Sequence, residues 1–401
     1  ATYNTAVGHT AGYSITTGTQ NTLIGGLAGD AITTGSYNSL VGVNAGGAIT
    51  TGAQNVAFGQ GALSTNTTGA TNTALGDSSL AANTTASNNT AVGQAALTAN
   101  TTGTQNVAVG SLALDANTTT HDSVAVGYAA LTTATVGTNT AVGSEAMQYT
   151  TSGANNVGVG LQALRANTTG TGNTAVGQGA GIAVTTGSNN TIVGKLAGDA
   201  ITTGSANVAI GEDALSTATT ADNNTAVGQG ALEATTTGAN NVAVGMSALV
   251  ANTTGTHNTA VGVYALDANT TATANTALGS STLTANTTGA DNVAVGHSAL
   301  EANTTASNST AVGKNALKAN TTGDLNTAVG TNALAACTTG NHNTAMGQRS
   351  LVSNTTGSYN IAIGRASLEA NTTASNNTAV GIHALLANTT GTENVAVGSY
   401  A

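Results

Sequence analysis

A 17-residue repeat runs through the whole chain and constrains its fold more than any other feature. A glycine closes each short apolar stretch of the type A-V-G, at Gly8, Gly25 and onward to Gly398, and these 24 coil glycines define the register. Of the 23 spacings between them, 22 are 17 residues, whereas Gly127 to Gly143 is 16. Repetition at a short fixed period means that each repeat copies one structural unit, which stacks on its neighbours.

Each repeat contains one segment that is typical of a short β-strand. An asparagine, here called the strand asparagine, stands four residues before the coil glycine in 22 of 24 repeats, and Ser123 and Ser309 replace it in the other two. Thr or Val, Ala and an apolar residue follow, as in residues 258–262, N-T-A-V-G. Because side chains alternate along a strand, Asn and Ala are expected to share one face, and the other two residues the opposite face.

Seventeen residues are too few for a strand plus a helix of normal length, and Gly, Thr and Asn are poor helix formers. The repeat therefore predicts an all-β parallel β-solenoid, or β-roll, of about 24 coils, in which equivalent residues stack about 4.8 Å apart. Residues 1–401 are expected to form one elongated repetitive region, a segment of a longer fibre or filament without caps. The residue missing between Gly127 and Gly143 falls in 136–139, which predicts a loop or turn there. The strand asparagines are expected to form a structural ladder that includes Asn21, Asn106, Asn173, Asn258, Asn326 and Asn394.

At two positions that follow the coil glycine, a bulky apolar side chain stands at one position or at the other. Leucine stands four residues after the coil glycine in 17 of 23 repeats, but five repeats carry glycine there. In those five, the usual asparagine three residues later becomes Ile or Val. Because one bulky group is lost where another is gained, both positions are predicted to face the coil interior. The five pairs are Gly12–Ile15, Gly29–Ile32, Gly46–Ile49, Gly181–Val184 and Gly198–Ile201.

Charge is scarce, with 6 Lys+Arg against 16 Asp+Glu and a net charge of −10. A nucleic-acid partner is not expected, since phosphates need clustered cations. No run of about 18 apolar residues occurs, so no membrane insertion of this segment is expected. Identical charges stacked about 4.8 Å apart would repel each other, so charges are expected only at outward, variable positions. Such positions follow the coil glycine at Lys195, Glu212 and Arg365, and follow the leucine at Asp115, Glu233 and Glu301.

Threonine pairs follow the position that exchanges Asn for Ile. Thr stands eight residues after the coil glycine in all 23 repeats, and a second Thr follows in 21. If this segment were extended, the two side chains would point to opposite faces, leaving one outward. Where Asn precedes the pair, N-T-T is an acceptor pattern for N-glycosylation, although it could equally build an internal amide ladder. The candidate glycosylation sites are Asn66, Asn83, Asn100, Asn117, Asn167, Asn252, Asn269, Asn286, Asn303, Asn320, Asn354, Asn371 and Asn388.

The repeat resembles the YadA-like head repeats of trimeric autotransporter adhesins. Residues 89–103, N-T-A-V-G-Q-A-A-L-T-A-N-T-T-G, and 258–272, N-T-A-V-G-V-Y-A-L-D-A-N-T-T-A, carry the resemblance, which covers the whole chain. It also extends to the repeat shafts of phage and viral tail fibres. The resemblance implies a β-roll that packs as a homotrimer. The 17-residue unit is longer than the family's coil, and the stalk and membrane anchor of a complete adhesin are absent from this sequence.

No constellation of catalytic residues is found. No two of the six His stand at one register in neighbouring coils, Asp and Glu form no recurring pair, and Cys337 replaces one of the repeated Asn residues as a small filler. The sequence therefore predicts no enzyme, no cofactor and no metal. Each coil offers few large apolar residues, which suggests self-association as a homotrimer or end-to-end filament, with the Asn/Ala face packed between chains.

The sequence favours a structural or adhesive extracellular fibre, located at a cell surface or on a virion. A glycan or cell-surface ligand would bind exposed turn residues such as Tyr37, Gln105, Tyr359 and Glu393, weakly at each coil and more strongly by multivalency. Two alternatives stay open. One is the shaft of a viral tail fibre without its own receptor site, and the other is an ice- or crystal-binding solenoid that uses threonine ladders.

Overall fold

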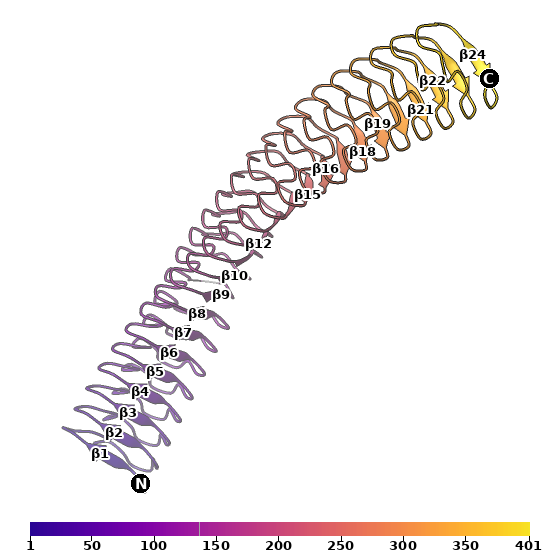
Figure 1. The fold of residues 1–401 in the computed structure, drawn as a ribbon. Helices are drawn as coiled ribbons and strands as arrows, with labels where there is room; N and C mark the ends of the chain where they lie inside the picture. Colours follow the sequence, from indigo (N-terminus) through magenta and orange to yellow (C-terminus); the bar gives the residue numbers. More distant parts are fainter. Residues whose placement is uncertain (136) are drawn as a thin grey trace. The chain divides into compact units, whose positions relative to one another are not determined.

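The computed structural model describes residues 1–135 and 137–401 and confirms the all-β parallel solenoid with a 17-residue repeat. The chain divides into two units, Ala1–Gly204 and Ser205–Ala401, each a stack of coils (Figure 1). Every coil contributes one strand of three residues, and turns and bends make up the rest. The described residues include no helix that is long and apolar enough to cross a membrane.

The strands recur at the spacing of the sequence repeat. Those of the first unit are β1 Thr5–Val7, β2 Thr22–Ile24, β3 Ser39–Val41, β4 Val56–Phe58, β5 Thr73–Leu75, β6 Thr90–Val92, β7 Val107–Val109, β8 Val124–Val126, β9 Thr140–Val142, β10 Val157–Val159, β11 Thr174–Val176 and β12 Thr191–Val193. Those of the second unit are β13 Val208–Ile210, β14 Thr225–Val227, β15 Val242–Val244, β16 Thr259–Val261, β17 Thr276–Leu278, β18 Val293–Val295, β19 Thr310–Val312, β20 Thr327–Val329, β21 Thr344–Met346, β22 Ile361–Ile363, β23 Thr378–Val380 and β24 Val395–Val397.

Within each unit, successive strands pair in parallel and in register. Thr5 in β1 pairs with Thr22 in β2, a step of 17 residues, and the same step recurs along both stacks. β8 and β9 are the exception, because Val124 pairs with Thr140. The missing residue therefore leaves the strand register intact. The loop predicted at 136–139 falls partly outside the described residues, and residues 137–139 lie outside the strands, just before β9.

The middle residue of each strand points into the coil, and its two neighbours point outward. In β6, Ala91 is fully buried, whereas Thr90 and Val92 are partly exposed. The strand asparagines are buried with the alanines, so Asn and Ala do share one face. The expectation that this face packs between chains is wrong, because it already forms the interior of each coil.

The exchange of leucine for glycine is confirmed as a packing exchange. Leu63 and its equivalents other than Leu385 are fully buried, and so are Ile32, Ile49 and Ile201 in the coils that have glycine instead. A Cβ atom added to Gly29 would lie 2.7 Å from Cδ1 of Ile32. The isoleucine thus fills the space that a leucine side chain occupies in the other coils.

This leucine position also demands an unusual backbone. Leu97 and Leu300 have φ of 53° and 50°, and all the described leucines of this column lie in the left-handed region. Leucine there carries strain of about 1 kcal/mol that glycine avoids. Burial of the leucine side chain contributes about 1.5–3 kcal/mol, which exceeds the strain and explains why leucine predominates.

A second exchange, which was not recognised in the sequence, occurs near the short repeat. Met147 replaces the buried leucine, and Gly158 in β10 replaces the usual middle alanine. A Cβ atom at residue 158 would lie 2.9 Å from Cγ of Met147. The missing methyl group therefore makes room for the longer methionine side chain.

The threonine pairs lie in bends rather than in strands, so the alternation expected of an extended segment does not apply. In the coil that contains Thr253 and Thr254, the first side chain is partly exposed and the second is exposed. The expectation that only one threonine of each pair faces outward is therefore wrong. Both columns reach the surface.

Candidate functional site

The strand asparagines form a hydrogen-bonded ladder inside each unit, which in the first unit is interrupted between Ser123 and Asn139. The backbone N–H and the side-chain Nδ2 of Asn21 both donate to Oδ1 of Asn4, at 2.9 and 3.1 Å, and Nδ2 also donates to the carbonyl oxygen of Gly35 at 3.0 Å. Asn258 repeats the first two bonds to Asn241, at 3.0 and 3.2 Å. Each buried amide is thus paired on its donor and acceptor sides, which is what burial of polar groups requires.

The other strand asparagines predicted from the sequence lie in the same ladder. The backbone N–H of Asn106, Asn173 and Asn394 each donates to Oδ1 of the preceding strand asparagine, at 3.0, 2.8 and 3.0 Å. Asn326 follows a serine instead, and its N–H donates to Oγ of Ser309 at 3.3 Å. Ser309 thus continues the ladder with a single, longer bond, whereas Asn139 makes no such bond to Ser123. The role of these residues is internal, and none of them offers a surface site.

The asparagines of the N-T-T segments form a second internal ladder. Nδ2 of Asn83 donates to Oδ1 of Asn66 at 2.9 Å and to the carbonyl oxygen of Ala86 at 3.0 Å. Asn388 is partly exposed but makes the equivalent bonds, to Asn371 at 3.2 Å and to Gly391 at 2.9 Å. A glycan would have to be attached to an amide nitrogen that already donates to one protein oxygen, as in Asn66 and Asn354, or to two, as in Asn83.

N-glycosylation is therefore incompatible with the folded coils, and the internal amide ladder explains the N-T-T pattern. Twelve of the thirteen candidate sites are fully buried. The correction applies to Asn66, Asn83, Asn100, Asn117, Asn167, Asn252, Asn269, Asn286, Asn303, Asn320, Asn354, Asn371 and, through its hydrogen bonds, Asn388.

This second ladder ends wherever the next coil lacks a donor. Oδ1 of Asn167 and Oδ1 of Asn320 are buried without a hydrogen-bond partner. The equivalent residues of the following coils are Val184 and Cys337, neither of which carries an amide. An unpaired buried oxygen costs about 1–3 kcal/mol, so each break is a local weak point in the stack.

Cys337 lies inside the coil in place of an asparagine. Its Sγ donates to the carbonyl oxygen of Gly340 at 3.5 Å. Burial raises the pKa of the thiol to about 11, against smaller opposing effects of hydrogen bonds with Gly340 and Asn354. The thiol is therefore protonated at neutral pH and is a filler rather than a nucleophile.

A third column, which the sequence reasoning missed, caps backbone N–H groups from the next coil. The N–H of Ser307 donates to Oδ1 of Asp324 at 2.6 Å, and that of Asp324 donates to Oδ1 of Asn341 at 2.7 Å. The N–H of Asn341 continues the series to Oγ of Ser358 at 3.0 Å. The detectable signal was the recurrence of Ser, Asp and Asn eleven residues after the coil glycine, because their short side chains readily accept from nearby backbone groups.

Charged side chains lie mainly along the turns after the coil glycine and after the leucine. Arg165 Nε lies 3.0 Å from Oε2 of Glu145, and Lys318 Nζ lies 3.3 Å from Oε2 of Glu301. Not all of these positions are freely outward as expected, because Oδ1 of Asp115 is buried and unpaired. Desolvation by burial raises the pKa of the carboxyl groups of Asp115 and Asp267, against weaker backbone hydrogen bonds that lower it.

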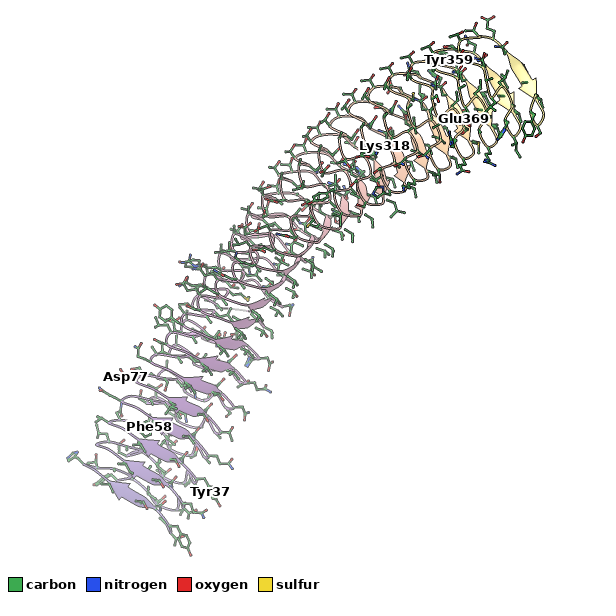
Figure 2. All side chains as sticks on the ribbon, in the orientation of Figure 1. Tyr37, Phe58, Asp77, Lys318, Tyr359 and Glu369 are labelled. Atoms are coloured by element: carbon green, nitrogen blue, oxygen red, sulfur yellow. The ribbon has the colours of Figure 1, made fainter. Side chains whose placement is uncertain are left out.

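The turn residues expected to bind a ligand are exposed but dispersed. Tyr37, Gln105, Tyr359 and Glu393 stand at one register, twelve residues after their coil glycines, with φ between 58° and 63°. Tyr37 and Tyr359 are each 58% exposed and project away from the coils (Figure 2). His342 stacks on Tyr359 with ring centroids 4.8 Å apart. These residues are separated along the stacks and do not converge on one pocket.

The outer sheet face, defined as the first and third residues of every strand, is the most extensive uniform surface. Its third column is entirely apolar, and its first column is Thr, Val, Ser or Ile. Exposure reaches 54% at Phe58, 47% at Leu278 and 42% at Met346, and the labelled Phe58 can be followed in Figure 2. No charged residue stands in either column in either unit. An extended apolar face of this kind is a candidate interaction surface.

The third column runs along both units. Its members in the first unit are Val7, Ile24, Val41, Phe58, Leu75, Val92, Val109, Val126, Val142, Val159, Val176 and Val193. Its members in the second unit are Ile210, Val227, Val244, Val261, Leu278, Val295, Val312, Val329, Met346, Ile363, Val380 and Val397.

Comparison with known proteins adds no further assignment. No family model matches the chain, and no curated protein matches it.

Proposed function

We propose that this chain is a structural solenoid that associates side by side with copies of itself through the outer sheet face. The observation that carries the proposal is the uncharged apolar third column, which is exposed or partly exposed at every coil, while charged side chains lie mainly along the turns. This places the interface on the face opposite to the one expected from the sequence. A homotrimer is the proposed state, since the repeat resembles that of trimeric adhesin heads.

The energetics favour a long stack over a short one. Covering a third-column side chain that is about 40% exposed, such as Ile24 or Met346, contributes roughly 1 kcal/mol, and the partly exposed valines contribute less. Association costs about 4–15 kcal/mol in lost freedom, so two or three coils would not suffice. Twelve coils in one unit contribute on the order of 10 kcal/mol, and the partner's own column adds to it. A long stack therefore buries enough apolar surface to offset the cost of association, whereas a single coil does not.

The proposed role is a non-catalytic, extracellular fibre, at a cell surface or on a virion, that adheres to a surface or spaces another element from it. Exposed turn residues such as Tyr37 and Tyr359 would supply weak contacts to a glycan or another cell-surface ligand, repeated along the fibre. The alternative role, the shaft of a viral tail fibre without its own receptor site, would need this fold but none of these contacts. End-to-end filament formation is compatible with either role.

The test is the molar mass of the full chain in solution, measured by light scattering after size exclusion. About three times 38.2 kDa is expected for the natural sequence. The triple variant Val261→Lys, Val295→Lys and Val329→Lys charges the outer sheet face in alternate coils and should shift the mass toward the monomer. The matched control places lysine at Thr254, Thr288 and Thr322 in the same coils and should leave the mass unchanged. A monodisperse natural monomer would refute the proposal.

A further inference from the structure

The second threonine of each pair is exposed and yet hardly varies. It is exposed in every coil that the structure describes, with Ser152 in one coil, and Val136, the other departure, lies outside the described residues. Other exposed positions vary freely. Directly after the coil glycine, for example, stand Glu212, Met246 and Lys314 in different coils. An exposed position that stays constant among coils whose other exposed positions change has a role beyond folding.

The fold does not use the hydroxyl group of this residue in most of the second unit. Within the described chain, no hydrogen bond is made by the side-chain hydroxyls of Thr237, Thr254, Thr271, Thr288, Thr305, Thr322, Thr339, Thr356, Thr373 and Thr390. What the fold needs is the backbone, since the N–H of Thr254 donates to the carbonyl oxygen of Thr270 at 3.3 Å. Any residue other than proline could supply that bond.

The first threonine makes the array regular. Oγ1 of Thr253 donates to the carbonyl oxygen of Thr270 at 3.0 Å, and Oγ1 of Thr304 donates to that of Thr321 at 3.0 Å. These bonds fix the side-chain rotamers of the first column in the same way in successive coils. The second column stands directly beside it and repeats at the coil spacing of about 4.8 Å. Methyl and hydroxyl groups thus recur periodically, without a charge in either column.

A periodic surface of this kind suits a ligand that is itself periodic. It offers no concave pocket for a small molecule, and a single threonine gives only a weak contact. Weak contacts add when both partners repeat, as in multivalent binding. Hydroxyl groups can hydrogen-bond to ordered water, and methyl groups occupy gaps in it without competing for hydrogen bonds. Because neither threonine column contains a charged side chain, the surface lacks strongly hydrated groups that would disturb an ordered water layer.

We propose that the second-threonine column of residues 237–390 binds ice. The column lies in the bends and is distinct from the outer sheet face, so this proposal does not depend on self-association. A charged, long side chain in the column would both break its regularity and bind its own hydration water.

The experiment measures inhibition of ice recrystallisation and thermal hysteresis for the full chain. Activity is expected for the natural sequence and should be lost in the Thr254→Lys, Thr288→Lys, Thr322→Lys variant. The Val261→Lys, Val295→Lys, Val329→Lys variant should keep it, although it is expected to lose association. Circular dichroism and the melting temperature check that each variant is folded.

Four results would overturn the proposal. The natural chain could be inactive in both assays, the threonine variant could be folded and fully active, or the outer-sheet variant alone could lose activity. Binding to a crystalline polysaccharide without any effect on ice would also overturn it. The light-scattering mass reports on self-association separately, so failure of one proposal can be told from failure of the other.

Discussion

Substitution of Cys337 by asparagine should stabilise the coil around it, although the natural residue is fully buried and well packed. The position of Cys337 is an asparagine in both neighbouring coils, Asn320 and Asn354. The coil of Cys337 also has the usual buried leucine, Leu334. An asparagine therefore fits this position without a change in its surroundings. It would rejoin two separated runs of the second ladder.

The gain follows from the bonds that the ladder makes elsewhere. Nδ2 of Asn371 donates to Oδ1 of Asn354 at 3.0 Å, and an asparagine at 337 would make the same bond to the unpaired Oδ1 of Asn320. Satisfying that buried oxygen recovers about 1–3 kcal/mol, and the new acceptor for Asn354 adds about 0.5–1.5 kcal/mol. Loss of the buried thiol costs about 1 kcal/mol, which offsets part of this gain. The net stabilisation is expected to be about 1–3 kcal/mol.

Hydrogen exchange is the appropriate assay, because a stack of repeats need not unfold in one step. Backbone amides of the coil that contains residue 337 should exchange about 5- to 100-fold more slowly in the variant, since every 1.4 kcal/mol is a factor of ten. Cys337→Ala is the matched control, because it removes the thiol without adding an amide. If the asparagine variant exchanged as fast as the alanine variant, the ladder would not contribute as argued.

Two further predictions concern the core and the half-buried acids. Gly29→Ala places a methyl group 2.7 Å from Cδ1 of Ile32 and should destabilise by about 1–3 kcal/mol, whereas adding Ile32→Val removes that atom. In denaturant unfolding, the double variant should therefore be more stable than the sum of the single effects by about 0.5–2 kcal/mol, and strict additivity would contradict the packing exchange. Asp115→Asn with Asp267→Asn should raise the melting temperature at pH 7 but not at pH 3. Burial raises the pKa of both carboxyl groups above 3.8 in the folded protein, because the charged forms are desolvated there. The protonated acids therefore do not reduce stability below pH 3.8, and stability is lost as the pH rises through the folded-state pKa.

The coil architecture could be predicted because the same residue pattern recurs in every repeat. The spacing of the coil glycines predicted the parallel stack, and Thr5 and Thr22 do pair across one repeat. The exchange of Gly29 with Ile32 identified two interior positions without any coordinates. Both inferences compare one coil with another inside the same chain, where departures from the pattern reveal which positions share a space.

What could not be predicted was which strand face is the interior. Alternation divides Asn and Ala from Val and Thr, but it does not say which pair lies inside. Ordinary hydrophobicity favours burying Val261 rather than Asn258, and the structure does the reverse. The reason is the narrow coil, in which Leu266 and its equivalents occupy most of the interior and the remaining space suits only alanine and an amide that stacks on its own kind.

The inward amide ladders and the outward apolar column are two consequences of one arrangement. A coil that buries Asn258 must satisfy both sides of its amide, and the neighbouring coils do so, since Nδ2 donates to Oδ1 of Asn241 at 3.2 Å and to the carbonyl oxygen of Ala272 at 2.8 Å. The interior is therefore stabilised by repetition along the stack and needs no other chain. Val261 and its equivalents remain outside, where burial can come only from contact with another surface. A fold whose polar groups are satisfied internally while its apolar strand residues are exposed is thus suited to lateral association, which is the property that charging Val261, Val295 and Val329 would test.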